Sequence, residues 1–144
     1  MKKISLILVA ISLFVFSNAN AQKKYLAVSE TPGQIISYIN AHFPKSEIIS
    51  VKKDKEVLKT EYKVKLNTMV ELEFDGNFSI KKIESKSALP QSVVPEKIVA
   101  YIHKNYPNNK ILEWKKEKKG QKIELDNDID VVFDLNGKFL GIDR

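Results

Sequence analysis

The residues best suited to chemistry form a short acidic run, Asp126-Asn127-Asp128-Ile129-Asp130. Carboxylates at alternate positions are typical of the start of a calcium-binding loop, where side-chain oxygens surround the cation. Two other parts of such a loop are missing, because Val131 stands where glycine is needed and no glutamate follows at the twelfth position. The run also falls between two predicted strands, where Asp and Asn are common turn residues. We favour a solvated turn and keep a cation site of Asp126, Asp128 and Asp130 as the alternative.

The other residue types provide little for catalysis. The chain has no cysteine, which excludes thiol nucleophiles and cysteine-ligated zinc. Its two histidines, His42 and His103, lie off the apolar stripes of their predicted helices, so we expect them on the surface. The sequence offers no Ser-His-Asp arrangement of the kind that nucleophilic hydrolysis requires. We therefore expect a protein that is not an enzyme and that needs no cofactor.

Residues 1–21 have the three parts of a secretory signal peptide. Lys2 and Lys3 form the positive end, and an apolar run of 13 residues follows from Ile4 to Phe16. Small residues then precede a cleavage point after Ala21. The apolar run is shorter than the roughly 18 residues of a membrane span. We expect a periplasmic or secreted protein that does not span the membrane once the signal is cleaved.

The charge of the mature chain argues against nucleic acid as a partner. Without Lys2 and Lys3, 22 Lys and Arg residues stand against 18 Asp and Glu residues, a net charge of +4. The two signs alternate along the chain and form no one-sided basic stripe. An envelope protein is the partner class that we expect, and the sequence does not fix the oligomeric state.

The mature chain contains one unit twice. Residues 32–44 match residues 95–107 at an offset of 63, and residues 64–75 match residues 123–134 at an offset of 59. The first match includes Pro32 with Pro95 and Pro44 with Pro107. We assign a first repeat to residues 22–86 and a second to residues 87–144.

Each repeat predicts one helix followed by strands. Ile35, Ile36, Ile39 and Phe43 form one apolar stripe, and Thr31 is a predicted N-cap before Pro32. In each repeat a first strand is predicted around residues 48–53 or 111–117. A hairpin with alternating apolar and polar residues follows, and a last strand comes after the turn near residue 76 or 137. The predicted fold is α+β, a tandem repeat of helix and antiparallel strands that forms one sheet with both helices on one face.

Opposite-charge pairs are predicted on the open face of the first hairpin. If Leu66 faces Val70, then Lys65 faces Glu71 and Lys63 faces Glu73. The same register in the second hairpin places Glu124 opposite Asp130, a like-charge pair that should destabilise the hairpin. A cation, a basic partner, or water with neighbouring lysines would relieve this repulsion.

Trp114 is the only tryptophan, and its place depends on which sheet face the helices cover. By alternation it shares a face with Leu112. We favour a core position, and the alternative is an exposed anchor for a partner, since Trp is common at interface hot spots.

The repeated motifs resemble a known family. Asn105-Tyr106-Pro107 and Phe133-Asp134-Leu135-Asn136-Gly137-Lys138-Phe139 are similar to PepSY-like, beta-lactamase-inhibitory-protein-like (BLIP-like) domains of exported bacterial proteins, common among the Bacteroides and their relatives. The resemblance extends from Tyr25 to Asp143, and the first copy departs from it in a turn shortened by two residues. It implies a tandem αβ-repeat fold and a periplasmic or exported location, and it assigns no inhibitory residues.

Two functions remain open. The first is a non-enzymatic, protein-binding or inhibitor-like module of the cell envelope, with binding residues Lys63, Lys65, Glu71, Glu73, Glu124, Asp130 and Trp114. The second is a small-ligand or calcium sensor that uses the Asp126–Asp130 turn.

Overall fold

The computed structural model describes residues 22–143, and the predicted signal peptide lies outside the described residues. The elements are, in chain order, β1 (Gln22–Leu26), η1 (Val28–Glu30), α1 (Gly33–His42), β2 (Ile48–Lys55), β3 (Thr60–Leu66), β4 (Val70–Asp75), β5 (Ile80–Ser85), η2 (Gln91–Val93), α2 (Glu96–Asn105), β6 (Ile111–Lys116), β7 (Gln121–Leu125), β8 (Asp130–Phe133) and β9 (Phe139–Asp143). η1 and η2 are single 3-10 turns.

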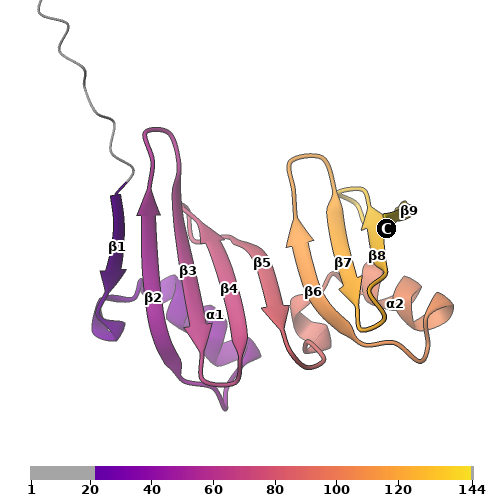
Figure 1. Ribbon diagram of the computed structural model, residues 1–144, viewed down its shortest axis with the longest axis horizontal. Coiled ribbons are helices and arrows are strands. Elements are labelled where there is room, and N and C mark those ends of the chain that lie inside the picture. The colour runs from indigo at the N-terminus through magenta and orange to yellow at the C-terminus, as the bar shows by residue number, and fades with distance from the viewer. Residues whose placement is uncertain (1–21, 144) are drawn as a thin grey trace, which may run out of the picture.

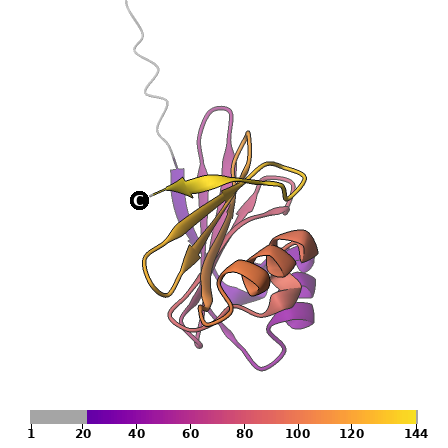
Figure 2. The same ribbon diagram turned by 90° about the vertical axis from the view of Figure 1, so that its right-hand side faces the viewer.

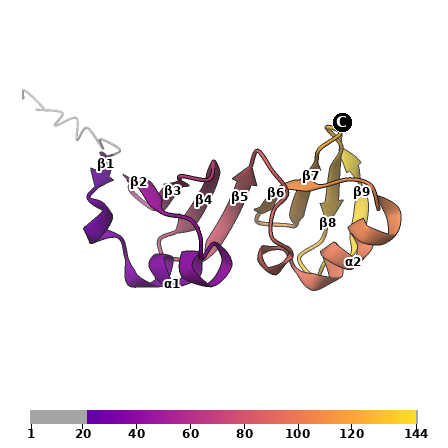
Figure 3. The same ribbon diagram turned by 90° about the horizontal axis from the view of Figure 1, so that it is seen from below.

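The nine strands form one antiparallel sheet in which each strand pairs with its neighbours in sequence, from β1 to β9 (Figure 1). Both helices lie against the same face of the sheet (Figure 2), one under each half (Figure 3). The predicted α+β fold with a single antiparallel sheet is confirmed. The sequence did not predict β1, because four of its five residues are exposed and its apolar and polar residues do not alternate.

The two halves have matching cores. We call α1 with β2–β5 the first unit and α2 with β6–β9 the second unit. Equivalent side chains are at most 2% exposed in both: Ile35 and Ile98, Ile39 and Ile102, Val64 and Ile123, Leu66 and Leu125, Leu72 and Val131, Phe74 and Phe133. Each such burial contributes about 1.5–3 kcal/mol. Tyr38 meets Phe74 edge-on at 5.5 Å between ring centroids, and Tyr101 meets Phe133 in the same way at 5.4 Å.

Both helices begin directly after a proline. Pro32 and Pro95 are the N-cap residues, and both have φ −54° and ψ 136°. The predicted N-cap at Thr31 is wrong, because the extended ψ of Pro32 delays the helix by one residue. The Thr31 hydroxyl instead donates a hydrogen bond of 2.6 Å to the carbonyl oxygen of Val28 and closes the turn η1.

The apolar stripe of α1 is narrower than predicted. Ile35 and Ile39 are buried, whereas Ile36 is 36% exposed and lies at the edge of the core. The helix ends at His42, with Phe43 as its C-cap. Pro44 then follows, as expected for a residue that cannot continue a helix.

The β4–β5 and β8–β9 turns have the same length, which corrects the expectation of a shortened first turn. In each turn one aspartate oxygen accepts two backbone N–H bonds, of 2.9 Å in the first and 2.8 Å in the second. The donors are Asn77 and Ser79 to Asp75, and Asn136 and Lys138 to Asp134. The expectation came from aligning Gly76 with Gly137, but these glycines do not occupy equivalent places in the two turns.

The two units share one sheet and one core. β5 and β6 meet in three residue pairs, in which Ile83 faces Trp114. The buried residues of both units form one cluster across this seam. Within residues 22–143, no helix is long and apolar enough to cross a membrane.

Candidate functional site

The sheet face opposite the helices carries rows of charged side chains. In the first unit the predicted ion pairs are present, because the hairpin register places Lys63 opposite Glu73 and Lys65 opposite Glu71. The Nζ atom of Lys63 lies 3.1 Å from Glu73 Oε1, and that of Lys65 lies 2.7 Å from Glu71 Oε1. These pairs are half-exposed, so they order the surface more than they stabilise the fold.

In the second unit like charges face one another. Glu124 lies opposite Asp130, as the register predicted, and Glu113 lies opposite Glu124. The lysines do the same, since Lys115 lies opposite Lys122. Like charges directly opposite in a sheet repel, so this half of the face is electrostatically unfavourable in isolation.

One acidic row crosses six adjacent strands. Each of its members lies opposite the next across the sheet, from β4 to β9: Glu71, Glu84, Glu113, Glu124, Asp130 and Asp143. Neighbouring strands are about 4.8 Å apart, so the row is roughly 24 Å long. We call it the acidic row.

Lysines of the next row neutralise part of the acidic row diagonally. The Nζ atom of Lys82 lies 2.9 Å from both Glu84 Oε2 and Glu113 Oε2. Burial lowers the pKa of Lys82, but the hydrogen bonds to these carboxylates outweigh it and raise the pKa above its ordinary value. Lys122 donates a hydrogen bond of 2.6 Å to Asp130 Oδ2, which raises the pKa of that ammonium group.

Glu124, in the middle of the acidic row, lacks an ion pair. Among residues 22–143 no lysine lies within ion-pair distance of its carboxylate. Partial burial, followed by the charges of Glu113 and Asp130, raises the pKa of Glu124. A positive group from a partner would therefore be favourable beside the Glu124 carboxylate.

Trp114 does not belong to this face. Its side chain is 5% exposed and lies on the helix side of the sheet, where its indole N–H donates a bond of 3.0 Å to Gln121 Oε1. Trp114 therefore stands apart from the charged residues of the open face, and the core position favoured from the sequence is the observed one. Burial opposite Ile83 at the seam gives Trp114 a structural role.

The three carboxylates of the Asp126–Asp130 turn have separate surroundings. Asp126 Oδ1 accepts a hydrogen bond of 2.9 Å from the Asn109 side chain, which lowers the pKa of Asp126. Asp130 pairs with Lys122, and Asp128 occupies a turn position with φ 61°. Within the described part of the chain, no group of three or more acidic, histidine or cysteine side chains could hold a metal ion.

Both histidines contact the 3-10 turn η2. His42 Nδ1 lies 2.9 Å from Ser92 Oγ, and His103 Nε2 lies 3.2 Å from Gln91 Nε2. Neither contact joins a histidine to a nucleophile and an orienting acid, so the described residues contain no such triad around them.

Sequence reasoning missed half of the acidic row. Glu84 and Glu113 escaped notice because their meeting depends on the pairing of β5 with β6 across the two units. A signal was present, since Lys82-Ile83-Glu84 and Glu113-Trp114-Lys115 both alternate charged and apolar residues. That alternation predicts a half-buried strand with its charges on one face.

Comparison with known proteins identifies one family and several structural relatives. A family model described as "Putative beta-lactamase-inhibitor-like, PepSY-like" matches residues 17–82 and again residues 81–141. Three similar solved structures each cover 85% of this chain. No curated protein matches the chain.

The solved relatives come from Bacteroides species. A "putative calcium-regulated periplasmic protein" of Bacteroides thetaiotaomicron is 27% identical, with 97% of that chain covered and a TM-score of 0.79. A "putative periplasmic protein from DUF2874 family" of Bacteroides vulgatus is 28% identical, with 97% covered and a TM-score of 0.79. A second Bacteroides vulgatus protein, a "putative periplasmic protein of unknown function", is 27% identical, with 100% covered and a TM-score of 0.80.

Proposed function

Because the chain belongs to the PepSY-like, beta-lactamase-inhibitor-like family, we propose that it is a non-enzymatic binding module that docks an envelope protein on the open face of its sheet. The expected periplasmic or secreted location agrees with the three relatives, which are all named as periplasmic proteins. One observation carries the proposal. Both helices lie on one face of the sheet (Figure 2). The other face bears charged side chains held by ion pairs.

The size of this face suits a protein partner. Nine strands about 4.8 Å apart, with roughly six residues each, make a surface of roughly 38 Å by 20 Å. This is close to the 800 Å² or so that one partner buries in a standard protein interface. A small ligand would need a concave pocket rather than a broad face.

The charge pattern favours specificity over bulk affinity. Lys63 and Glu73, and Lys82 with Glu113, are already paired, so a partner must present complementary charges in register to gain from them. Glu124 gains most from a basic group of the partner. A partner with a different charge spacing would instead place like charges together.

An apolar hairpin tip stands beside the face. Val57 is 79% exposed and Leu58 is 98% exposed in the loop between β2 and β3, which is closed by a hydrogen bond from the Glu56 N–H to the Lys59 carbonyl oxygen. Burial of such a side chain against a partner is favourable by about 1.5–3 kcal/mol. The tip thus supplies an apolar contact that the charged face lacks.

A charge-swap variant tests the proposal without disturbing the ion pairs. The variant K63E/E73K/K65E/E71K keeps the net charge and all four partners but inverts the pattern. We expect the immobilised wild-type protein to retain a specific envelope protein at low salt. The swapped variant should retain at least about tenfold less of that protein.

The matched control is the swap K45E/E47K in the loop after α1, where both side chains are exposed and outside the sheet. It should bind like the wild type. Equal binding by the open-face swap and the wild type would contradict the proposal, as would the absence of any salt-sensitive partner.

A cation-sensing function is the second candidate, favoured by the calcium-regulated relative. For this chain it would use Asp126, Asp128 and Asp130. Native-state binding of calcium must raise the thermal midpoint. We expect a rise at millimolar calcium if the turn binds the cation, and D126N/D128N should remove it. An unchanged midpoint would exclude this function.

A further inference from the structure

A cleft separates the two units on the helix side of the sheet. Its volume is about 580 Å³, within the usual range of small-molecule sites. Tyr38, Phe78 and Ile80 line it from the first unit, and Trp114, Lys116 and Lys97 line it from the second. It lies on the face opposite the charged rows, so it is separate from the proposed docking surface.

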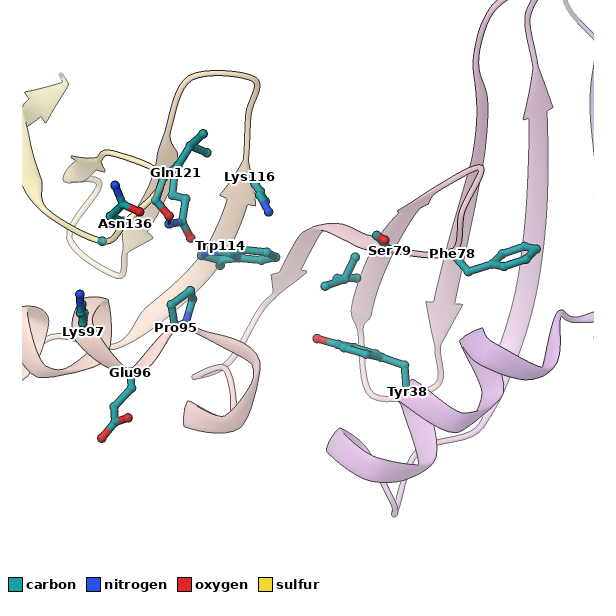
Figure 4. A pocket seen from close by; sticks show the side chains of 13 residues that line it. Tyr38, Phe78, Ser79, Pro95, Glu96, Lys97, Trp114, Lys116, Gln121 and Asn136 are labelled. Atoms are coloured by element: carbon teal, nitrogen blue, oxygen red, sulfur yellow. Dashed lines mark hydrogen bonds between the residues drawn. The ribbon is translucent and has the colours of Figure 1, made fainter.

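The repeat explains why the cleft is open. In the second unit the Tyr101 ring is stacked on Phe139, with 4.8 Å between centroids and 12° between planes. The equivalent position in the first unit is Ile80, which has no ring to stack on Tyr38, and Tyr38 packs instead against His42 and Phe74. In Figure 4 the Tyr38 hydroxyl points toward the second unit. Burial still raises the pKa of Tyr38 to about 12, so the ring stays neutral.

The walls of the cleft are aromatic and its mouth is positive. Lys97 and Lys116 have no carboxylate within ion-pair distance among residues 22–143. Glu96 also borders the cleft, but its carboxylate points away from the other side chains in Figure 4. An anionic group beside Lys116 would therefore meet a free ammonium group, and its apolar body would lie against the rings of Tyr38 and Trp114. Lys97 and Phe78 lie at opposite ends of the cleft (Figure 4).

We propose that the cleft between the units binds a small carboxylate with an aromatic or aliphatic body, its body between Tyr38 and Trp114 and its carboxylate at Lys116. Such a group could come from a free organic acid or from the C-terminal residue of a peptide. Both sources present the same chemistry to the cleft.

The single tryptophan makes the test direct. The indole N–H of Trp114 gives one cross-peak in a nitrogen-15 correlation spectrum, and titration with 4-phenylbutyrate should shift that peak to saturation. The uncharged 4-phenylbutyramide should bind about tenfold or more weakly, because it lacks the charge-assisted contacts. The same comparison between acetyl-Gly-Phe and its C-terminal amide distinguishes a peptide end from a free acid, and the tighter of the two acids identifies the source.

Two variants locate the site. K116Q should reduce the affinity of the acid to that of the amide, whereas K118Q, outside the cleft, should leave it unchanged. Ile80→Phe copies Phe139 into the first unit and should abolish the shift by filling the cleft. An unmoved Trp114 peak, equal affinity for acid and amide, or normal binding by the folded I80F variant would overturn the proposal.

Discussion

Left-handed backbone positions occur at equivalent places in the two units. Met69 and Asp128 have φ values of 60° and 61°, and Phe78 and Gly137 have φ values of 63° and 82°. Such conformations are costly for most residues and mild for Asp, Asn and Gly. The left-handed backbone at position 128 thus explains why an aspartate stands there without a role as a metal ligand.

Replacement of Gly137 tests this backbone requirement. A Cβ atom there would have a strained φ and would meet the Cβ of Lys97 at 3.1 Å. Gly137→Ala should lower the free energy of unfolding by about 1–2 kcal/mol and the thermal midpoint by about 5 °C. Gly141→Ala is the matched control, because nothing lies within 4 Å of its Cβ position. Equal midpoints for the two variants would contradict the account.

The β3–β4 and β7–β8 hairpins are equivalent in the two units but carry different charges. Lys65 and Glu124 occupy equivalent positions, and each faces an acid across its hairpin, Glu71 in the first and Asp130 in the second. The first hairpin gains an ion pair, whereas in the second, partial burial and then the repulsion of Glu113 and Asp130 raise the pKa of Glu124. Because this repulsion lies on the proposed docking face, we interpret it as a feature of binding rather than of folding.

Glu124→Gln should therefore stabilise the protein at neutral pH. A raised folded-state pKa means that protonated Glu124 suits the native state, and this stability is lost as the pH rises through the folded pKa. At pH 7 the variant should gain about 0.5 kcal/mol, or about 2 °C. The gain should vanish below the ordinary pKa of 4.5. Melting curves at pH 7 and pH 4 measure both values, and a gain that persists at the lower pH would refute the electrostatic explanation.

Patterns of neighbouring residues predicted the helices and hairpins. The contacts between the two units could not be predicted in this way. The apolar stripe with Ile35 and the alternation around Val64 require only neighbouring residues, so helix and hairpin were readable from the sequence. The meeting of Glu84 with Glu113 depends on how the two units join. The cleft depends on the difference in side-chain size between Ile80 and Phe139, which becomes visible only when both are placed in the fold.

The whole molecule is one sheet built from two units, with a different surface on each side. The open side is broad and charged, and the helix side carries one helix under each half (Figure 3), with the cleft between the units. One cluster of buried residues continues across the seam. A shared core of this kind predicts that the units fold together.

Cooperative unfolding is the corresponding prediction. Trp114 reports on the second unit and on its seam with β5, whereas far-ultraviolet circular dichroism reports on the whole chain. The two signals should give one coincident denaturant transition. Separate midpoints, with the fluorescence change preceding or following the loss of secondary structure, would show that the units are independent.

Site-specific photo-crosslinking in the native envelope tests the binding proposal most directly. A photoreactive residue would replace Glu73 or Glu124 on the open face, and Ser37 or Ala100 at equivalent exposed positions of the two helices. We predict that the two open-face positions crosslink to the same envelope protein and that the two helix positions do not. Crosslinks from the helix positions to that protein, or none from the sheet, would contradict the assignment of the open face as the docking surface.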